Sequence, residues 1–228
     1  MSDQPHAFEG DLCHAAKSTS AMHLALVLLG GDAGLRRGEL IALEAQDVDF
    51  KRGVITVQRS ETRGKVTFPK GGRSRKVPMT SLLQATLEKV CGERKSGRVL
   101  RREGGLLMTP ETVKWWMSHL QREAKLEVTS GIHILRHTFC SHLAMKGPSA
   151  VDIQALAGHR SLETTMRYMH LSPTHRATVI GLLDQRTRAA LREEEVGSSQ
   201  AEKRGLAATS PQNRGGDVAA DHSRSATT

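Results

Sequence analysis

The apolar residues of this chain take up a helical period from about residue 21 onward. Residues 1–20 are polar and aperiodic, so we expect only a short lead-in there. Residues 21–30 (AMHLALVLLG) are apolar on nearly every face, which predicts a buried helix that ends at a pair of glycines. Helical spacing resumes over residues 36–46 (RRGELIALEAQ) and predicts another helix after the glycine turn.

The apolar period changes from helix to strand near residue 54. Apolar and polar side chains alternate over residues 54–58, as they do in a half-buried strand. Residues 65–68 and 75–79 are two further candidate strands, and the glycines and proline between them predict a turn. We therefore expect residues 50–79 to form a small three-stranded antiparallel sheet.

Helical patterns return after the sheet. Ser149 is a suitable N-cap with Asp152 three residues later, and Gly158 suits the end of that helix. Ser161 caps the next predicted helix, which carries Tyr168, the only tyrosine of the chain. The predicted helices cover about residues 80–95, 110–126, 134–146, 150–157, 162–170 and 173–191.

The elements predict one folded domain over residues 21–191. Its fold class is α+β, mainly α, with the small sheet inserted among helices. From about residue 196 the chain is rich in Ser, Ala, Gly, Thr and Gln and has few large apolar residues. Such a composition cannot bury enough apolar surface to fold, so we expect residues 192–228 to be a disordered tail.

The charge of the chain indicates a polyanionic partner. The net charge is +9, and most of that excess lies before residue 185, in the part expected to fold. A charge of this sign favours nucleic acid or an anionic membrane surface. The segment Arg59–Lys76 holds seven Lys and Arg residues, with Glu61 as its one acid and glycines between them. This pattern is typical of a phosphate-binding surface.

The cysteines and the apolar runs bear on where the protein works. Cys13, Cys91 and Cys140 are an odd number and have no C-x-x-C spacing. Reduced thiols in the cytoplasm explain this pattern better than a disulfide framework or a zinc ribbon. The longest apolar run, near residue 25, is too short to span a bilayer. We therefore expect a cytoplasmic protein without a membrane partner.

Four separate stretches carry side chains suited to one reaction at a phosphate group. Each stretch places a basic, acidic or nucleophilic side chain at a turn or on a helix. The spacing of the third stretch puts its two cationic residues on one helix face. The stretches are AGLRRGEL with Arg36 and Glu39, PKGGRSRKVP with Lys70, HILRHTF with His133 and Arg136, and LAGHRSLETTMRYMHL with His159 and Tyr168.

These stretches, in this order, resemble the catalytic domain of the tyrosine recombinase (phage integrase) family. The family pattern has an Arg in a GLR-x-x-EL context, a Lys on a β-hairpin, an H-x-x-R box, a GH pair and a Tyr about nine residues later. The resemblance covers roughly residues 20–180, and four boxes in order are far more specific than any one of them. It implies a mainly helical domain with a small three-stranded sheet, and a site-specific recombinase or integrase of double-stranded DNA.

The resemblance also implies the roles of the central residues. Tyr168 would attack a DNA phosphodiester and form a 3′-phosphotyrosyl bond, without a metal or a nucleotide cofactor. Arg36 and Arg136 would donate paired hydrogen bonds to the extra negative charge of the five-coordinate transition state. His159 would add a further hydrogen bond to a phosphate oxygen.

The remaining residues of the site would move or orient charge. His133 would accept the tyrosine proton or bind phosphate, and Lys70 is the candidate acid that protonates the leaving 5′-oxygen. Neighbouring cations leave the assignment of Lys70 open. Glu39 would orient a basic partner. The residues expected to contact DNA are Arg59, Lys65, Arg73, Arg75 and Lys76.

His133 and His137 have the i,i+4 spacing of a zinc-binding helix. A zinc protease box needs a glutamate directly after the first histidine, and this chain has Ile134 there. We therefore predict no metal site, and we interpret His137 as a histidine that packs in the core or supports its neighbours.

The chain departs from the family at its N-terminus. Members usually carry an N-terminal helical domain that clamps the opposite face of the DNA, and the lead-in is too short for one. The clamp is then a separate chain, or the gene is a truncated relic, or the protein acts without a clamp. The alternatives to a recombinase are a type IB topoisomerase-like enzyme and a non-catalytic, integrase-derived DNA-binding protein. The family resemblance also predicts self-association on DNA.

Overall fold

The computed structural model describes residues 5–68, 74–129, 131–171 and 180–181. Residues 1–173 form one compact unit, to which the following description is confined. Its helices are α1 (Pro5–Thr19), α2 (Ala21–Gly31), α3 (Arg37–Ala42), α4 (Ser81–Cys91), α5 (Pro110–Glu123), α6 (His133–Lys146), α7 (Ala150–Ala157) and α8 (Leu162–Met166), with short 3-10 turns at Ala45–Asp47, Glu103–Gly105 and Met169–Leu171. No helix of the described ranges is long and apolar enough to cross a membrane.

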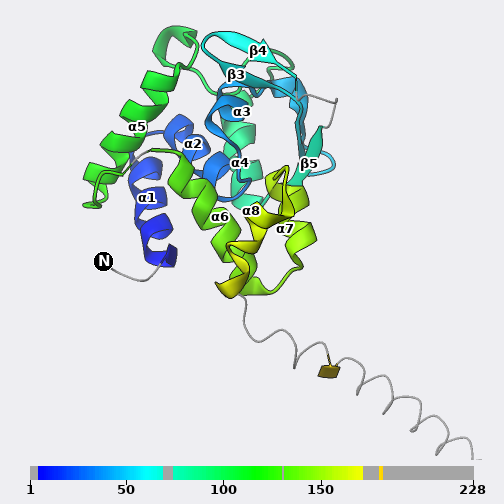
Figure 1. The fold of residues 1–228 in the computed structure, drawn as a ribbon. Helices are drawn as coiled ribbons and strands as arrows, with labels where there is room; N and C mark the ends of the chain where they lie inside the picture. Colours follow the sequence, from blue (N-terminus) through cyan, green and yellow to red (C-terminus); the bar gives the residue numbers. More distant parts are fainter. Residues whose placement is uncertain (1–4, 69–73, 130, 172–179, 182–228) are drawn as a thin grey trace, which may run out of the picture. The chain divides into compact units, whose positions relative to one another are not determined.

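Helix α2 lies at the centre of the helical core (Figure 1). Its sequence is apolar on every face, and eight consecutive residues, Leu24 to Gly31, are buried. Helices α1, α4 and α6 pack around it. Ser20 begins the helix by accepting a hydrogen bond from the His23 amide, as an N-cap residue does.

Helix α1 corrects the prediction for residues 1–20. We expected an aperiodic lead-in, but Pro5–Thr19 is helical and packs on α2, α5 and α6. Leu12 and Ala16 are fully buried and belong to the main core. The apolar face of this helix consists mostly of alanines, so its period is weak in the sequence although it buries surface in the fold.

The small sheet contains three antiparallel strands in the order β1 (Val48–Asp49), β2 (Val54–Val57), β5 (Arg75–Pro78). Ile55 faces Val77 across the sheet, and both are buried. The prediction of a three-stranded antiparallel sheet is confirmed, but one of its strands is different. The expected strand at residues 65–68 instead forms β4 (Lys65–Thr67), which pairs with β3 (Ser60–Thr62) in a separate hairpin.

The β3–β4 hairpin packs directly on helix α3. A Cβ added to Gly38 would lie 2.5 Å from the backbone oxygen of Glu61, which no real contact permits. The absence of a side chain at Gly38 therefore lets the strand approach the helix that begins after Arg36. This contact brings the hairpin against the start of α3.

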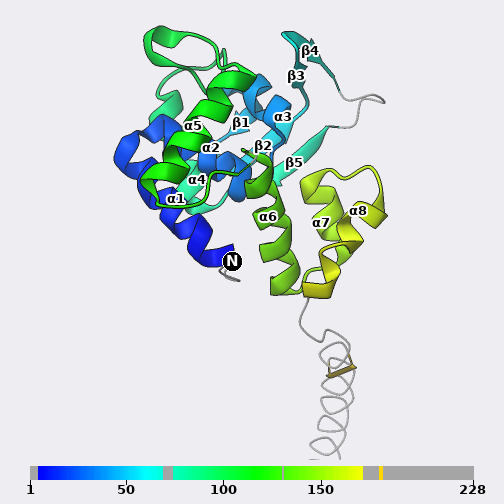
Figure 2. The ribbon, with the colours of Figure 1, turned by 60° about the vertical axis from the view of Figure 1, so that its left-hand side comes forward.

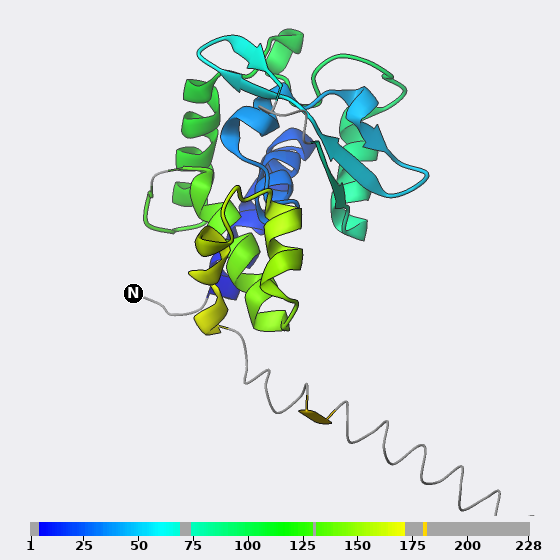
Figure 3. The ribbon, with the colours of Figure 1, turned by 45° about the vertical axis from the view of Figure 1, so that its right-hand side comes forward.

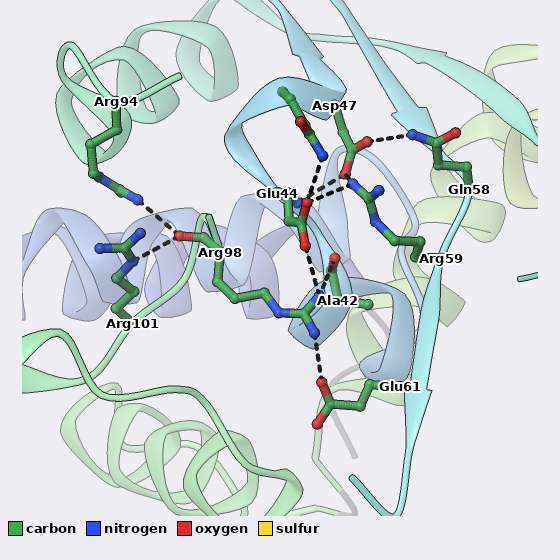
Figure 4. Close-up of polar contacts among 10 residues, drawn as sticks. Ala42, Glu44, Asp47, Gln58, Arg59, Glu61, Arg94, Arg98 and Arg101 are labelled. Carbon is green, nitrogen blue, oxygen red and sulfur yellow. Dashed lines mark hydrogen bonds and ion pairs between the residues drawn. The ribbon is translucent and has the colours of Figure 1, made fainter. Parts of the chain in front are cut away.

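A polar network holds the same hairpin from its other side (Figure 4). Arg98 donates to the Ala42 carbonyl at 2.5 Å and to the Glu61 carboxylate at 3.0 Å. Arg59 forms an ion pair with Asp47, and its distance to the Glu44 carboxylate is 3.2 Å. Since these side chains are mostly buried, each charge depends on its partner, and removing one partner would leave an uncompensated charge beside the hairpin.

Helices α7 and α8 lie next to α6 and below the strands of the sheet (Figures 2 and 3). They cover a second small core of Phe139, Cys140, Ala144, Ile153 and Ala157. The predicted bounds of the helix at 150–157 are confirmed, including the capping box of Ser149 and the left-handed Gly158. Local caps decide this helix, which explains why the sequence predicts it well.

Tyr168 does not lie within a helix as predicted. Helix α8 ends at Met166, and Tyr168 lies in the turn that leads into Met169–Leu171. The Tyr168 amide donates to the Thr165 carbonyl at 3.0 Å, and its side chain is half-buried against the second core. The predicted helix at 173–191 and the tail at 192–228 lie outside the described residues, apart from residues 180 and 181.

Candidate active site

The first part of the site is a carboxylate held between two guanidinium groups. Glu39 is 8% exposed and accepts hydrogen bonds from Arg36 Nη1 at 2.9 Å and from Arg75 at 2.9 and 2.7 Å. Its carboxylate also accepts from the Arg36 amide at 2.9 Å, which caps α3. Burial favours a higher pKa for Glu39, but the hydrogen bonds and charges of Arg75 and Arg36 outweigh burial and hold that pKa below its ordinary value.

The same two arginines hold the end of helix α7. Arg36 Nη2 donates to the Gly158 carbonyl at 2.7 Å, and Arg75 Nε donates to the Leu156 carbonyl at 2.9 Å. Carbonyls at a helix C-terminus have no partner within the helix and carry partial negative charge, so cations stabilise them. Gly158 has φ of +69°, and a Cβ there would lie 2.9 Å from the Arg75 side chain. The hydrogen bond from Arg36 to the Gly158 carbonyl therefore brings His159, the next residue, close to Arg36.

Arg136 contributes a second, buried guanidinium. It is 7% exposed, and its Nη1 donates to the Gly34 carbonyl. Its Nη2 is buried and has no hydrogen-bond partner among the described residues. Burial and the nearby charge of Arg36 lower the pKa of Arg136 to about 10. A buried donor beside a second cation is costly unless an acceptor or an anion binds it, so this group could donate to an anion.

Tyr168 is hydrogen-bonded within this group of cations. Its hydroxyl lies 2.5 Å from His137 Nδ1, and its ring stacks on His159 with centroids 6.3 Å apart and an interplanar angle of 10°. Burial, followed by the Cys140 thiol, raises the pKa of Tyr168 above its ordinary value. The hydroxyl therefore keeps its proton until a base removes it.

His137 corrects part of an expectation from the sequence. We interpreted it as a core histidine or one that supports its neighbours; it is exposed, so it is not in the core, and it contacts the Tyr168 hydroxyl. One signal was present in the sequence: His133, Arg136 and His137 share a helix face at spacings of three and four. The partner on that face is 31 residues further along the chain, and no local pattern shows it.

The other two histidines of the site lie in different surroundings. His159 Nδ1 is 2.9 Å from the hydroxyl of Thr165, which is fully buried and orients the ring. Burial and the charges of Arg136 and Arg36 lower the pKa of His159 to about 4, so its imidazole is neutral at pH 7. His133 is the first residue of α6. It is exposed overall, but partial burial and the charge of Arg37 lower its pKa as well.

A cleft of about 1320 Å³ opens beside these residues, between the hairpin and α7. Arg36, Arg75 and His159 line it, as does the exposed Arg160, which the sequence analysis did not select. Arg160 follows the GH pair directly, and this position was the available signal. Lys70 and Arg73 lie outside the described residues.

The structure places the other cations predicted to contact DNA in two kinds of environment. Lys65 on β4 and Lys76 on β5 are exposed. The side chains of Arg59 and Arg75 are 13% and 14% exposed, and their guanidiniums are ion-paired with Asp47 and Glu39. The charge of these two arginines is thus matched by carboxylates of the fold, and their contact with DNA stays a prediction.

Comparison with known proteins shows which family this chain is similar to. A sequence model described as the Phage integrase family matches residues 9–175 of this chain. The tyrosine recombinase XerA of Pyrococcus furiosus is 31% identical over 155 residues, which are 66% of this chain and 50% of XerA. The tyrosine recombinase XerC of Thermodesulfovibrio yellowstonii is 32% identical over 174 residues, 70% of this chain and 53% of XerC. The chain therefore spans about half the length of these relatives.

Solved structures show the same fold. The Tn1549 transposon integrase in complex with a circular intermediate DNA superposes with a TM-score of 0.62 at 25% identity, over 70% of this chain and 58% of the integrase chain. The XerA recombinase crystal structure gives a TM-score of 0.61 at 24% identity, over 78% of this chain and 64% of XerA.

Proposed function

We propose that this chain, which belongs to the phage integrase family, cuts and rejoins double-stranded DNA at specific sites through a 3′-phosphotyrosyl intermediate. The observation that carries the proposal is the position of the lone tyrosine. The ring of Tyr168 stacks on His159, and the carbonyl of the preceding Gly158 binds Arg36. Two residues, His159 and Gly158, thus connect the proposed nucleophile to the guanidinium of Arg36, which would bind phosphate.

In the proposed step the Tyr168 oxygen attacks the phosphorus, and the bond from phosphorus to the 5′-oxygen breaks. Negative charge builds up on the non-bridging oxygens, where Arg36 and the unpartnered Nη2 of Arg136 would donate hydrogen bonds. Preorganised donors of this kind contribute about 3–4 kcal/mol each to the transition state. When the Thr165 hydroxyl donates to Nδ1, the neutral ring of His159 carries its proton on Nε2 and can donate to the same phosphate.

The departing 5′-oxygen needs a proton, and we assign that proton to Lys70. Replacing Lys70 with Ala should slow cleavage of ordinary DNA by about 10²-fold or more, in the range of general acid catalysis. A substrate with sulfur in place of the 5′-oxygen should restore the rate, because a thiolate leaves without protonation. Single-turnover adduct formation on the two substrates measures the effect. Lys65→Ala and Lys76→Ala are the matched controls, and equal behaviour of all three variants would contradict the assignment.

The proposed function is tested by trapping the covalent intermediate. A nicked suicide duplex loses the 5′-hydroxyl strand by diffusion, so the protein should accumulate as a denaturation-resistant adduct with DNA. We expect the same amount of adduct in excess chelator, because the nucleophile is a side chain and not a metal-bound water. Denaturing electrophoresis with and without the chelator gives the result. Loss of the adduct with chelator and its return with a divalent ion would indicate a metal-dependent nuclease instead.

Further partners follow from the family and the charge. Double-stranded DNA would bind over the exposed Lys65, Lys76 and Arg160, whose phosphate contacts make affinity fall with rising salt. We also propose self-association on DNA and cooperation with a clamp domain, from this gene or another.

Cys13, Cys91 and Cys140 are free thiols, which supports a cytoplasmic location. Binding of DNA without any adduct would favour the non-catalytic alternative, and relaxation of supercoils without strand exchange would favour the topoisomerase.

A further inference from the structure

The Tyr168 hydroxyl contacts a histidine, His137, to which the proposed cleavage step gives no role. The Tyr168 hydroxyl has a hydrogen bond of 2.5 Å to His137 Nδ1, and the two rings are 5.8 Å apart at 44°. The tilt lets the hydroxyl approach the ring nitrogen at the edge of the imidazole. His137 is exposed on α6, one residue after the buried Arg136, so its ring lies at the surface of the same site.

We infer that His137 is the base that takes the proton from Tyr168 as the tyrosine attacks phosphorus. This inference rests on the proposed function and assigns a further catalytic residue to it. The sequence pointed to His133 for this step, whereas the hydrogen bond of the tyrosine hydroxyl goes to His137.

The surroundings of the pair suit a proton transfer in this direction. Burial raises the pKa of Tyr168, so the phenol needs a partner to lose its proton. Arg136 and Arg167 act in the opposite direction and stabilise the phenolate once it forms. The charged and titratable groups around the pair are His133, Arg136 and Cys140 of α6, His159 after α7, and Arg167 beside the tyrosine.

The step is balanced in atoms and charge. The phenol O–H bond breaks and its proton moves to Nδ1 of a neutral His137, which becomes an imidazolium with both nitrogens protonated. The phenolic oxygen forms the bond to phosphorus, and the 5′-oxygen leaves with a proton from the acid on its own side. In the reverse reaction His137 returns its proton to Tyr168 when the 5′-hydroxyl rejoins the strand.

The single tyrosine makes the contact observable without DNA. Growth on 3-fluorotyrosine would label position 168 alone, because the chain has one tyrosine. The fluorine resonance should differ between wild type and His137→Ala, because the substitution removes the hydrogen-bond partner of the hydroxyl. The exposed His170, two residues from the tyrosine, provides the control: His170→Gln should keep the wild-type resonance. An unchanged resonance in His137→Ala would overturn the inference, whatever happens on DNA.

Two substitutions separate proton transfer from positioning. His137→Asn keeps an acceptor oxygen near the place of Nδ1 but cannot hold the proton, whereas His137→Ala removes both functions. We expect both variants to form adduct at least about 10²-fold more slowly near neutral pH, and to recover as the pH rises toward ionisation of the phenol. His170→Gln should react at the wild-type rate. A His137→Asn variant that reacts like wild type, with the same pH profile, would show that His137 only positions the tyrosine and would overturn the inference.

A more acidic nucleophile tests the same step by rescue. With 3,5-difluorotyrosine at position 168 the phenol ionises more readily, so His137→Ala should regain much of its rate relative to wild type. A structural defect would not respond to the acidity of the phenol. Absence of rescue in a folded variant that binds DNA normally would overturn the inference. Wild-type protein that forms no adduct on any duplex would instead contradict the proposed function, while the fluorine resonance still reports on the contact itself.

Discussion

Tyr168→Phe should form no covalent adduct with a suicide duplex, while its affinity for DNA stays close to that of the wild type. The substitution removes one oxygen, the proposed nucleophile, and the chain has no other tyrosine to replace it. Loss of the hydrogen bond to His137 should reduce the free energy of unfolding by only about 0.5–1.5 kcal/mol, so the variant remains folded. Denaturing electrophoresis measures the adduct, and salt titrations with labelled duplex measure the affinity.

The control for this variant is its own binding curve. Equal affinity with no adduct separates loss of chemistry from loss of binding, because position 168 carries an aromatic ring in both proteins. An adduct that persists in Tyr168→Phe would mean that another side chain is the nucleophile, and the proposed function would then need a different centre.

Glu39→Gln should destabilise the protein by about 3–5 kcal/mol, in the range measured when one partner of a buried ion pair is removed. The amide keeps the shape of the side chain but leaves Arg36 and Arg75 without the carboxylate that both of them bind. Their repulsion should loosen the start of α3 and the end of α7, so adduct formation should fall together with stability. Chemical denaturation of the two proteins measures the difference.

The pH dependence gives the sign of the same interaction. The pKa of Glu39 is lower in the folded protein than its ordinary value of 4.5. Its contribution to stability is therefore complete above about pH 4.5 and is lost as the pH falls through the folded pKa. The difference between wild type and Glu39→Gln should be largest at neutral pH and should shrink in acid. The exposed Glu123→Gln is the matched control and should change stability by less than about 0.5 kcal/mol at either pH; an equal effect of the two substitutions would contradict a special role for Glu39.

The parts of the fold that depend on neighbouring residues follow well from the sequence. Helix α7 has the predicted bounds because Ser149, Asp152 and Gly158 form its caps within the helix itself. Strand β2 is found where apolar and polar residues alternate, since alternation is imposed by the strand's own geometry. The buried helix α2 is predicted by its continuous apolar run.

The errors arise where contacts far apart in the chain decide the structure. Helix α1 is stabilised by the surface it buries on the distant helices α5 and α6 as well as on α2, and the buried Ala15 and Ala16 give a weak apolar period. Strand β4 pairs with β3 instead of the main sheet, because Gly38 and Arg98 hold the hairpin against α3 and away from β5. Tyr168 lies in a turn since the chain bends there to pack on the second core.

The family of the protein follows from the sequence alone, because each motif is a short run whose residues support one another locally. The sequence placed Arg36 and Glu39 on one helix start and the His159–Tyr168 pair on one stretch of chain. Only the tertiary structure decided which groups meet: Arg75 with Glu39 across 36 residues, Arg36 with the Gly158 carbonyl across 122, and His137 with the tyrosine hydroxyl across 31. Partners at such separations are set by the packing of α6, which contributes to the main core together with α3 and to the second core together with α7, and no local period records that packing.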